Sequence, residues 1–239
     1  MANYILVHGA WHGAWCWDKV VPLLQQHGHT ATAIDLPAHG EDLTPVADVS
    51  LQLYADKICA VISQQQEPVI LVGHSLGGIS ITQAAEQCPS NIRQLVYLSA
   101  FLLPNGVARL GYGSDIEGSL IDANKIMSDD KTCVSFDLAG LKETFYLDCC
   151  ADDIAKATKL IRPEPIAGIV TPVHYTAENF GVIPRVYIEC LQDCAILPAL
   201  QKRMYTETPV AEVVTMGTSH SPFFSAAEQL VEHLIELAA

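Results

Sequence analysis

The 239-residue chain lacks the features that would connect it with a membrane or a nucleic acid. No apolar run is long enough to span a bilayer, and no basic segment followed by an apolar one opens the sequence. Basic residues are scarce, with 13 Lys and Arg against 27 Asp and Glu, and the net charge of −14 argues against nucleic-acid partners. We therefore expect a cytoplasmic protein that binds neither membranes nor nucleic acids.

The sequence also lacks the cysteine spacing of a metal site. Its eight cysteines include no C-x-x-C pair of the kind that binds zinc. Most of them lie within or beside apolar segments, where a free thiol behaves as a small hydrophobic side chain. Without an export signal, reduced thiols are more typical than disulfides. The sequence thus predicts no metal site and reduced cysteines.

Apolar residues are abundant, at 50% of the chain against 17% charged residues, which is enough for a sizeable core. Short apolar runs that predict buried strands alternate with patterns that predict helices. This order implies a mostly parallel sheet with helices on both faces. The expected strands are 4–7, 31–35, 68–72, 94–98, 185–190 and 211–216, and the expected helices are 15–27, 51–66, one after residue 75, 195–206 and one from Pro222.

The alternation stops in the segment 101–180. This part contains several glycines and short helical patterns but no clear buried strand, and its most convincing helix is 152–160. We interpret 101–180 as a mainly helical cap inserted over the end of the sheet. Residues 1–100 and 181–239 would then form one α/β core.

Residues 68–79 predict where the chemistry takes place. An apolar run ends in Gly-His-Ser-Leu-Gly at 73–77, and a helical pattern follows at once. A strand, a sharp turn and a helix around Gly-x-Ser-x-Gly form the context of a nucleophile elbow, where the serine adopts strained backbone angles and glycines leave room beside it. Ser75 is therefore the predicted nucleophile, and the N–H of Leu76 can donate to a developing oxyanion. A glycine-rich turn with an inert serine is the alternative.

An elbow serine needs a base and an acid that orients the base. In α/β-hydrolases the order is Ser, acid, His, each in a loop after a strand. Asp193 follows the expected strand 185–190, and His220 follows the expected strand 211–216; the other histidines break this order or lie on helices or in the cap. We assign His220 as general base and then acid, and Asp193 as the group that holds its imidazole. An ordinary surface-loop aspartate is the alternative for Asp193, and Glu189 is set aside because it lies within a strand.

The loop after the first strand supplies the other half of the predicted oxyanion hole. Gly9 allows a tight turn, and the N–H of Ala10 would pair with that of Leu76. The ring of His8 is expected to hydrogen-bond to backbone near the site.

Three stretches together carry a family resemblance: Val7 to Trp15 (VHGAWHGAW), Gly73 to Gly78 (GHSLGG) and Arg185 to Asp193 (RVYIECLQD). The chain resembles the plant methylesterase and hydroxynitrile lyase group of α/β-hydrolases over nearly its whole length. This resemblance implies an enzyme without a cofactor, a small buried pocket beneath the cap that Phe101 lines, and often a homodimer.

Two departures from that group favour the esterases over the lyases. The resembled lyases of one type carry threonine after the first motif histidine and lysine after the catalytic histidine, to hold the cyanohydrin hydroxyl and the cyanide. Here these positions are Gly9 and Ser221, which offer neither a side-chain hydroxyl at the first place nor a positive charge at the second. We expect a serine carboxylesterase that acts on small neutral esters, methyl or aromatic esters among them, through an acyl-enzyme, with Gly9 and Phe101 at the substrate. Cyanohydrin-type C–C cleavage and a non-enzymic ligand receptor are the alternatives.

Overall fold

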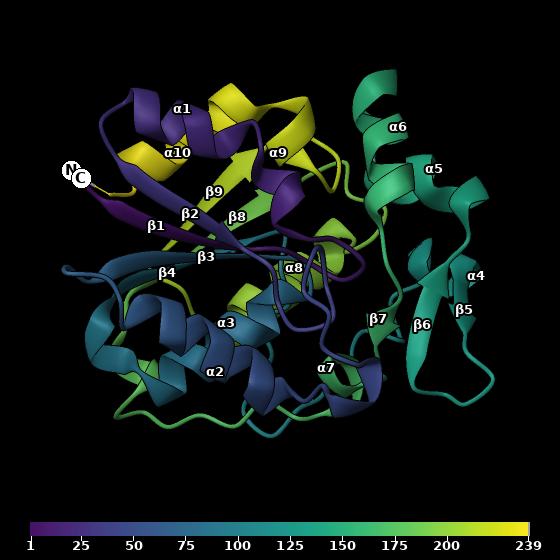
Figure 1. Ribbon diagram of the computed structural model, residues 1–239, viewed down its shortest axis with the longest axis horizontal. Coiled ribbons are helices and arrows are strands. Elements are labelled where there is room, and N and C mark those ends of the chain that lie inside the picture. Colours follow the sequence, from purple (N-terminus) through teal and green to yellow (C-terminus); the bar gives the residue numbers. More distant parts are fainter. Residues whose placement is uncertain (239) are drawn as a thin grey trace.

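A six-stranded parallel sheet forms the centre of the computed structural model, which describes residues 1–238 (Figure 1). The strand order is β2-β1-β3-β4-β8-β9, and every neighbouring pair is parallel. β3 is buried at every position and β1 at all but its first, as expected for strands covered on both faces. The strands are β1 (Asn3–Val7), β2 (Thr30–Ile34), β3 (Val69–His74), β4 (Ile92–Leu98), β8 (Arg185–Cys190) and β9 (Glu212–Met216).

Helices cover both faces of this sheet. α1 (Val20–Gln26) and α10 (Ala227–Glu236) pack together on one face, and α2 (Leu51–Ile62) and α3 (Gly77–Gln87) on the other (Figure 1). The predicted fold, an α/β-hydrolase sheet between two layers of helices, is confirmed. Since all six strands run the same way, their carboxyl ends meet at one edge, and the loops that follow β1, β3, β8 and β9 gather there.

Several helix boundaries differ from the predictions. The helix expected over 15–27 consists of a 3-10 helix, Ala14–Trp17, and then α1. The helix expected from 195 is α8 (Pro198–Glu207), because the proline ring suits a first helical turn. The closing helix from Pro222 is divided at Ala226, whose φ of −144° is not helical, into α9 (Pro222–Ser225) and α10.

Much of the cap segment, residues 101–180, lies beyond the carboxyl ends of the central strands, at the right of Figure 1. Its end, residues 176–180, lies instead against α3, where Glu86 accepts hydrogen bonds from the backbone N–H groups of Thr176 and Phe180. The prediction that this segment has no buried strand was wrong. It contains a three-stranded antiparallel sheet, and Val134 and Phe136 of its middle strand are buried. Strands of two to four residues are too short to show a clear period in the sequence. The elements are α4 (Ile121–Asn124), β5 (Lys125–Met127), β6 (Cys133–Phe136), α5 (Leu141–Phe145), α6 (Ala151–Leu160), β7 (Glu164–Pro165) and α7 (Ala167–Val170).

A buried ion pair attaches the cap segment to the core. Glu164 Oε2 lies 2.7 Å from His39 Nε2, and both side chains are almost fully buried. The same oxygen accepts a hydrogen bond from the backbone N–H of Trp11 at 3.1 Å. Burial by itself lowers the pKa of His39, but the carboxylate and its hydrogen bond outweigh that effect, so that the pKa is raised above its ordinary value. Glu164 therefore attaches the cap to two loops of the core: to the loop after β2 through His39 and to the loop after β1 through Trp11.

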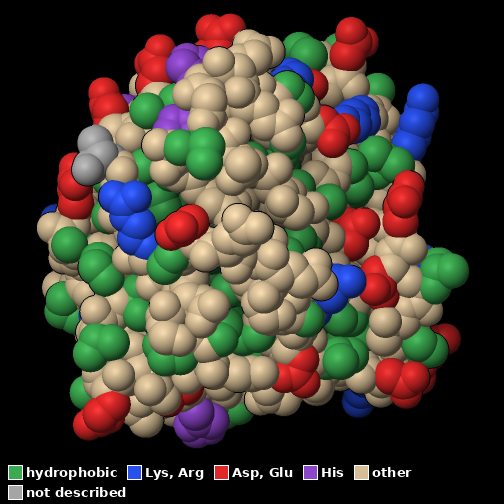
Figure 2. Space-filling view, turned by 60° about the vertical axis from the view of Figure 1, so that its left-hand side comes forward, with side chains coloured by type: hydrophobic (Ala, Val, Ile, Leu, Met, Phe, Trp, Pro, Cys, Tyr) green, Lys and Arg blue, Asp and Glu red, His purple; other side chains and the backbone are tan. Residues whose placement is uncertain are grey.

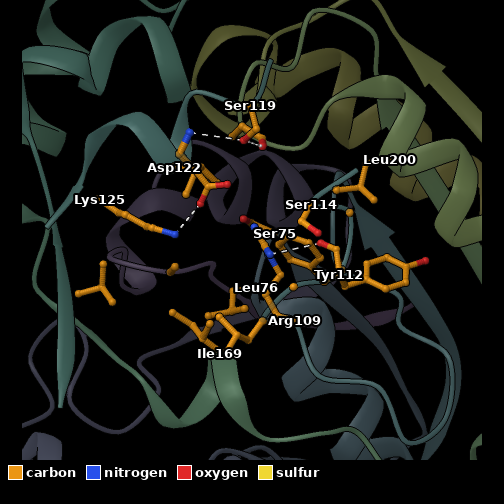
Figure 3. Close-up of a pocket in the computed structure, with 18 of the residues that line it drawn as sticks. Ser75, Leu76, Arg109, Tyr112, Ser114, Ser119, Asp122, Lys125, Ile169 and Leu200 are labelled. Carbon is orange, nitrogen blue, oxygen red and sulfur yellow. Dashed lines mark hydrogen bonds and ion pairs between the residues drawn. The ribbon is translucent and has the colours of Figure 1, made fainter. Parts of the chain in front are cut away.

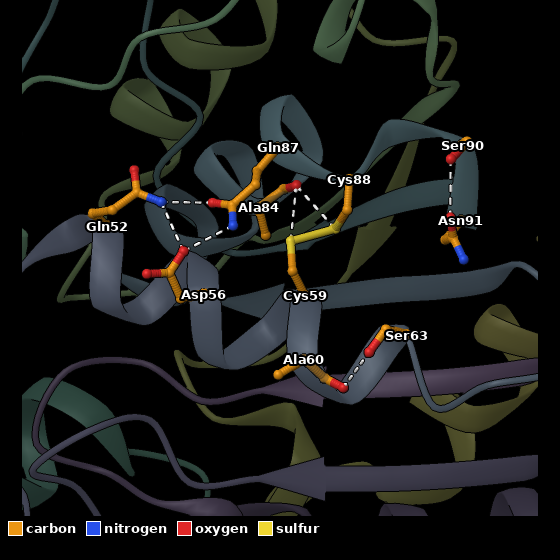
Figure 4. Close-up of a disulfide and its surroundings, with 10 residues drawn as sticks. All are labelled: Gln52, Asp56, Cys59, Ala60, Ser63, Ala84, Gln87, Cys88, Ser90 and Asn91. Carbon is orange, nitrogen blue, oxygen red and sulfur yellow. Dashed lines mark hydrogen bonds between the residues drawn. A yellow bond between two sulfur atoms is a disulfide. The ribbon is translucent and has the colours of Figure 1, made fainter.

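Cys59 and Cys88 form a disulfide between α2 and the end of α3 (Figure 4). The expectation of reduced cysteines is therefore wrong for this pair, while the other cysteines are free. The two helices pack side by side, which brings the two Cα atoms within 6.1 Å, a distance that a disulfide spans. Sequence spacing alone could not pair these residues.

Acidic residues outnumber basic ones by 27 to 13. Acidic side chains are scattered over the face drawn in Figure 2, and the basic side chains form no continuous patch there. Within residues 1–238, none of the helices combines the length and the apolar character needed to cross a bilayer. The same residues contain no cluster of histidine, cysteine and carboxylate side chains suited to a metal ion.

Candidate active site

The turn after β3 has the geometry of a nucleophile elbow. Ser75 has a φ of +53°, in the left-handed region that non-glycine residues adopt rarely. A Cβ at Gly77 would lie 2.4 Å from the carbonyl oxygen of His8, and one at Gly73 would lie 2.9 Å from Ile81 Cδ1. Both glycines of the motif are thus required for close packing around the serine. The turn is fixed against the neighbouring chain, since Ser75 accepts a backbone hydrogen bond from Phe101 at 2.9 Å.

Asp193 and His220 form the second part of the site. They follow β8 and β9, and the structure joins them by a hydrogen bond of 2.7 Å from His220 Nδ1 to Asp193 Oδ2. Both side chains are buried. The other carboxylate oxygen accepts from the backbone N–H groups of Ala195, at 2.7 Å, and Ile196, at 2.9 Å. The hydroxyl of Ser99 also donates to Oδ2, so the carboxylate is held from several sides.

His220 is held against the elbow through the neighbour of the serine. His74 Nε2 donates to the carbonyl oxygen of His220 at 2.8 Å, and the two rings have centroids 4.5 Å apart. Among residues 1–238 no hydrogen bond joins the hydroxyl of Ser75 to the imidazole of His220. In enzymes without substrate this bond is often long or poorly aligned, and it tightens in the complex. The structure therefore brings the three predicted residues to one edge of the sheet and forms one of the two bonds of a triad.

Two backbone N–H groups at this edge have no partner. Ala10 and Leu76 both line the cavity that contains Ser75, and within the described part of the chain neither N–H donates to another group. The carbonyl of Gly9, which belongs to the same peptide group as the N–H of Ala10, accepts a hydrogen bond of 2.8 Å from His8 Nδ1. This contact fixes the plane of the peptide, and it polarises the N–H toward stronger donation.

The protonation of His8 can be read from its surroundings. The backbone N–H of Leu36 donates to His8 Nε2 at 3.1 Å, so that nitrogen carries no proton and Nδ1 is the donor. Burial, together with the neighbouring His39, lowers the pKa of His8 well below its ordinary value, so the ring stays neutral. The expected contact between the ring of His8 and nearby backbone is present.

A cavity of about 530 Å³ lies beneath the cap segment, and Ser75, Ala10 and Leu76 form part of its lining (Figure 3). Ser75, Leu76 and Phe101 form part of its wall, as expected for Phe101. Gly9, which we expected at the substrate, is not part of the lining. It lies behind Ser75, where a Cβ would be 2.6 Å from Ser75 Cβ. The cap contributes most of the remaining lining, which includes Arg109, Leu110, Tyr112, Ser114, Ile116, Ile121, Asp122, Lys125, Ile166 and Ile169.

Sequence reasoning missed three residues that support the site. Ser99 bonds to the carboxylate of Asp193, and its position directly after β4 was the available signal. His12 Nδ1 donates to the carbonyl of Ala10 at 2.7 Å and so fixes the oxyanion loop from the other side. Asp148 of the cap accepts from the N–H of Ser219 at 2.9 Å, next to His220. No local signal predicts Asp148, because its partner is 71 residues away.

Comparison with known proteins agrees with this geometry. The model of the alpha/beta hydrolase family matches residues 4–233. Methylesterase 9 of Arabidopsis thaliana is 34% identical over 252 residues, covering 100% of this chain and 98% of that protein. The chain spans only 56% of the length of putative chloroplastic methylesterase 13 of the same plant, at 32% identity. The crystal structure of methylesterase MES16 from Arabidopsis superposes with a TM-score of 0.85 at 27% identity, covering 100% of this chain and 99% of the other. The chain belongs to the alpha/beta hydrolase family, within the group that includes the plant methylesterases.

Proposed function

We propose that the protein is a serine carboxylesterase that hydrolyses small esters through an acyl-enzyme. The observation that carries this proposal is the buried His220–Asp193 pair, which His74 links to the elbow of Ser75. Ser75 and the residues with the two N–H groups without a partner, Ala10 and Leu76, line one cavity. The named methylesterases among the relatives support the same reaction class. The size of the cavity, about 530 Å³, suits a small substrate, and methyl and aromatic esters are the first candidates.

The proposed reaction has two halves. The oxygen of Ser75 attacks the ester carbonyl while His220 Nε2 takes the hydroxyl proton, and the N–H groups of Ala10 and Leu76 hold the oxyanion. The tetrahedral intermediate then expels the alcohol, which receives that proton from Nε2. Water, deprotonated by the same nitrogen, attacks the acyl-enzyme, and the proton returns to Ser75 as the acid leaves. Asp193 keeps the proton of the neutral ring on Nδ1 throughout.

The lyase alternative is disfavoured by the packing at Gly9. A threonine there would place its Cβ 2.6 Å from Ser75 Cβ and 3.0 Å from His74 Nδ1, so this loop has no space for the side chain that would hold a cyanohydrin hydroxyl. Ser221, the residue after the histidine, is buried and carries no charge. No feature of the site favours C–C cleavage over ester hydrolysis.

The test measures hydrolysis of p-nitrophenyl butyrate and methyl benzoate alongside cyanide release from mandelonitrile. We expect ester hydrolysis in the wild type and a loss of several powers of ten, about 10⁴-fold or more, in Ser75→Ala. Ser114→Ala is the matched control, because it removes another hydroxyl from the same cavity, and we expect it to keep most of the activity. Undiminished hydrolysis in Ser75→Ala, or cyanide release faster than ester hydrolysis, would refute the proposal.

A further inference from the structure

Arg109 of the cap segment places a guanidinium group in the wall of the cavity that contains Ser75. Figure 3 shows it beside Ser75 and Leu76, with Asp122 and Lys125 on another side of the cavity. Its Cζ lies 4.7 Å from the centroid of the Phe101 ring, so the group is stacked on an aromatic face. Its hydrogen-bonding capacity is almost unused, because within residues 1–238 its one bond is a long one of 3.4 Å to the carbonyl of Tyr112.

No carboxylate of the described chain forms an ion pair with this guanidinium. Asp122 also lines the cavity, but its Oδ1 already accepts from Lys125 Nζ at 2.7 Å. Glu117, the other acidic residue in the lining, is exposed to solvent. Arg109 is half-buried, and this burial lowers its pKa, while the charge of Asp122 offsets part of that effect. A partly desolvated cation without a partner is unfavourable until a ligand supplies the anion.

The position of Arg109 relative to the nucleophile limits what that ligand can be. Phe101, on which the guanidinium is stacked, donates its backbone N–H to the carbonyl of Ser75 at 2.9 Å. Ser75, Phe101 and Arg109 line the same cavity. An ester whose carbonyl is bound at Ser75 and the oxyanion hole would therefore extend along a wall formed by Phe101 and Arg109. A planar guanidinium binds a carboxylate through two parallel hydrogen bonds.

We propose that Arg109 binds a second, ionised carboxylate on the acyl side of the ester, so that the preferred substrates are monoesters of dicarboxylic acids. This inference rests on the proposed esterase function, and it replaces the expectation of a wholly neutral substrate. The net charge of −14 opposes the approach of anions, but solvent ions screen that repulsion beyond about 10 Å. Contact with Arg109 takes place inside the cavity, where a charged pair is screened much less.

The test uses the monomethyl esters of succinic, glutaric, adipic, pimelic and suberic acids. Each is compared with the matching methyl ester in which a carboxamide, similar in shape but neutral, replaces the free carboxylate. The quantity measured is the ratio of the two kcat/KM values at pH 7. At the chain length that reaches Arg109 we expect the wild type to favour the carboxylate about tenfold to a hundredfold, and mainly through KM.

Three variants separate the effect of Arg109 from that of the general charge of the cavity. Arg109→Met removes the charge at similar length and should abolish the preference, whereas Arg109→Lys should keep part of it. The double variant Asp122→Asn/Lys125→Met removes the other cation of the same cavity together with its paired carboxylate, and it should leave the ratio close to that of the wild type. A wild-type ratio near one at every chain length, or a preference that survives Arg109→Met, would overturn the proposal.

A binding measurement distinguishes failure of this subsite from failure of the esterase itself. Isothermal titration of Ser75→Ala with the same ester pairs does not depend on turnover. If Ser75→Ala binds the carboxylate esters more tightly than the carboxamides, and Ser75→Ala/Arg109→Met does not, the subsite is supported. This holds even if the wild type hydrolyses none of the esters, because the absence of hydrolysis would refute only the esterase function. Hydrolysis in the wild type with no carboxylate preference in either assay leaves the esterase standing and refutes the role of Arg109.

Discussion

The substitution Asp193→Asn tests the acid of the proposed triad with almost no change of shape. In the native protein both carboxylate oxygens only accept hydrogen bonds: Oδ1 from the backbone N–H groups of Ala195 and Ile196, and Oδ2 from His220 Nδ1 and the hydroxyl of Ser99. Asparagine keeps one acceptor oxygen. The two backbone donors cannot turn away, so the amide oxygen stays with them and its NH₂ group faces the imidazole.

The expected magnitude follows from this arrangement. An NH₂ group at that place requires Nδ1 of His220 to accept, which moves the ring proton to Nε2, the nitrogen that must take the proton of Ser75. We expect kcat/KM for p-nitrophenyl butyrate to fall about 10⁴-fold, equivalent to about 5.5 kcal/mol of barrier. The free energy of unfolding in urea should fall less, by about 1.5–3 kcal/mol, because neutral hydrogen bonds replace those that His220 and Ser99 donate to the charged Oδ2.

The control is Glu189→Gln in β8, the other acid near this edge. Glu189 accepts from Thr215 Oγ1 at 2.9 Å and from the hydroxyl of Tyr205 at 3.1 Å, and it has no bond to His220. Its substitution should leave kcat/KM close to that of the wild type. If the folded Asp193→Asn variant kept a kcat/KM within about tenfold of the wild-type value, the assignment of Asp193 as the acid would be contradicted.

Three further predictions follow from the packing around the site. Gly9→Ala should lower kcat/KM about a hundredfold, because the added Cβ would lie 2.6 Å from the Cβ of Ser75 and displace it. The kinetics are measured on a variant whose circular dichroism spectrum is native. An unchanged kcat/KM would contradict this prediction. The pKa of His39 is raised, so its pair with Glu164 contributes its full stability below the ordinary pKa of 6.5 and loses it as the pH rises through the raised pKa. Over that pH range the urea midpoint should therefore fall more in the wild type than in His39→Gln. Parallel curves of midpoint against pH would disprove this prediction. Cys59→Ser should lower the free energy of unfolding by about 3–4 kcal/mol, because the disulfide with Cys88 closes a loop with a sequence separation of 29. A reductant should cause the same loss in the wild type and no loss in the variant. If the reductant leaves the wild type unchanged, no disulfide forms.

The sequence predicts the core well because parallel strands covered on both faces are nearly continuous apolar runs. The bounds of β8, Arg185–Cys190, agree with the predicted ones to the residue, and β3 leads into the elbow as expected. The positions of Asp193 and His220 follow from chain order alone, since carboxyl ends of parallel strands share one edge. What cannot be predicted depends on contacts between distant segments. The short cap strand β6, the Cys59–Cys88 pairing and the position of Arg109 over Phe101 all depend on how segments pack in three dimensions.

The role of the nucleophile can be measured directly by covalent capture. The protein is treated with p-nitrophenyl diethyl phosphate, and intact mass and peptide mapping follow the adduct while ester hydrolysis is assayed in parallel. We predict one diethylphosphoryl group per chain on Ser75, with activity lost in proportion, little adduct in His220→Ala and none in Ser75→Ala. An adduct on another residue, or full inactivation of the enzyme with Ser75 unmodified, would contradict the account.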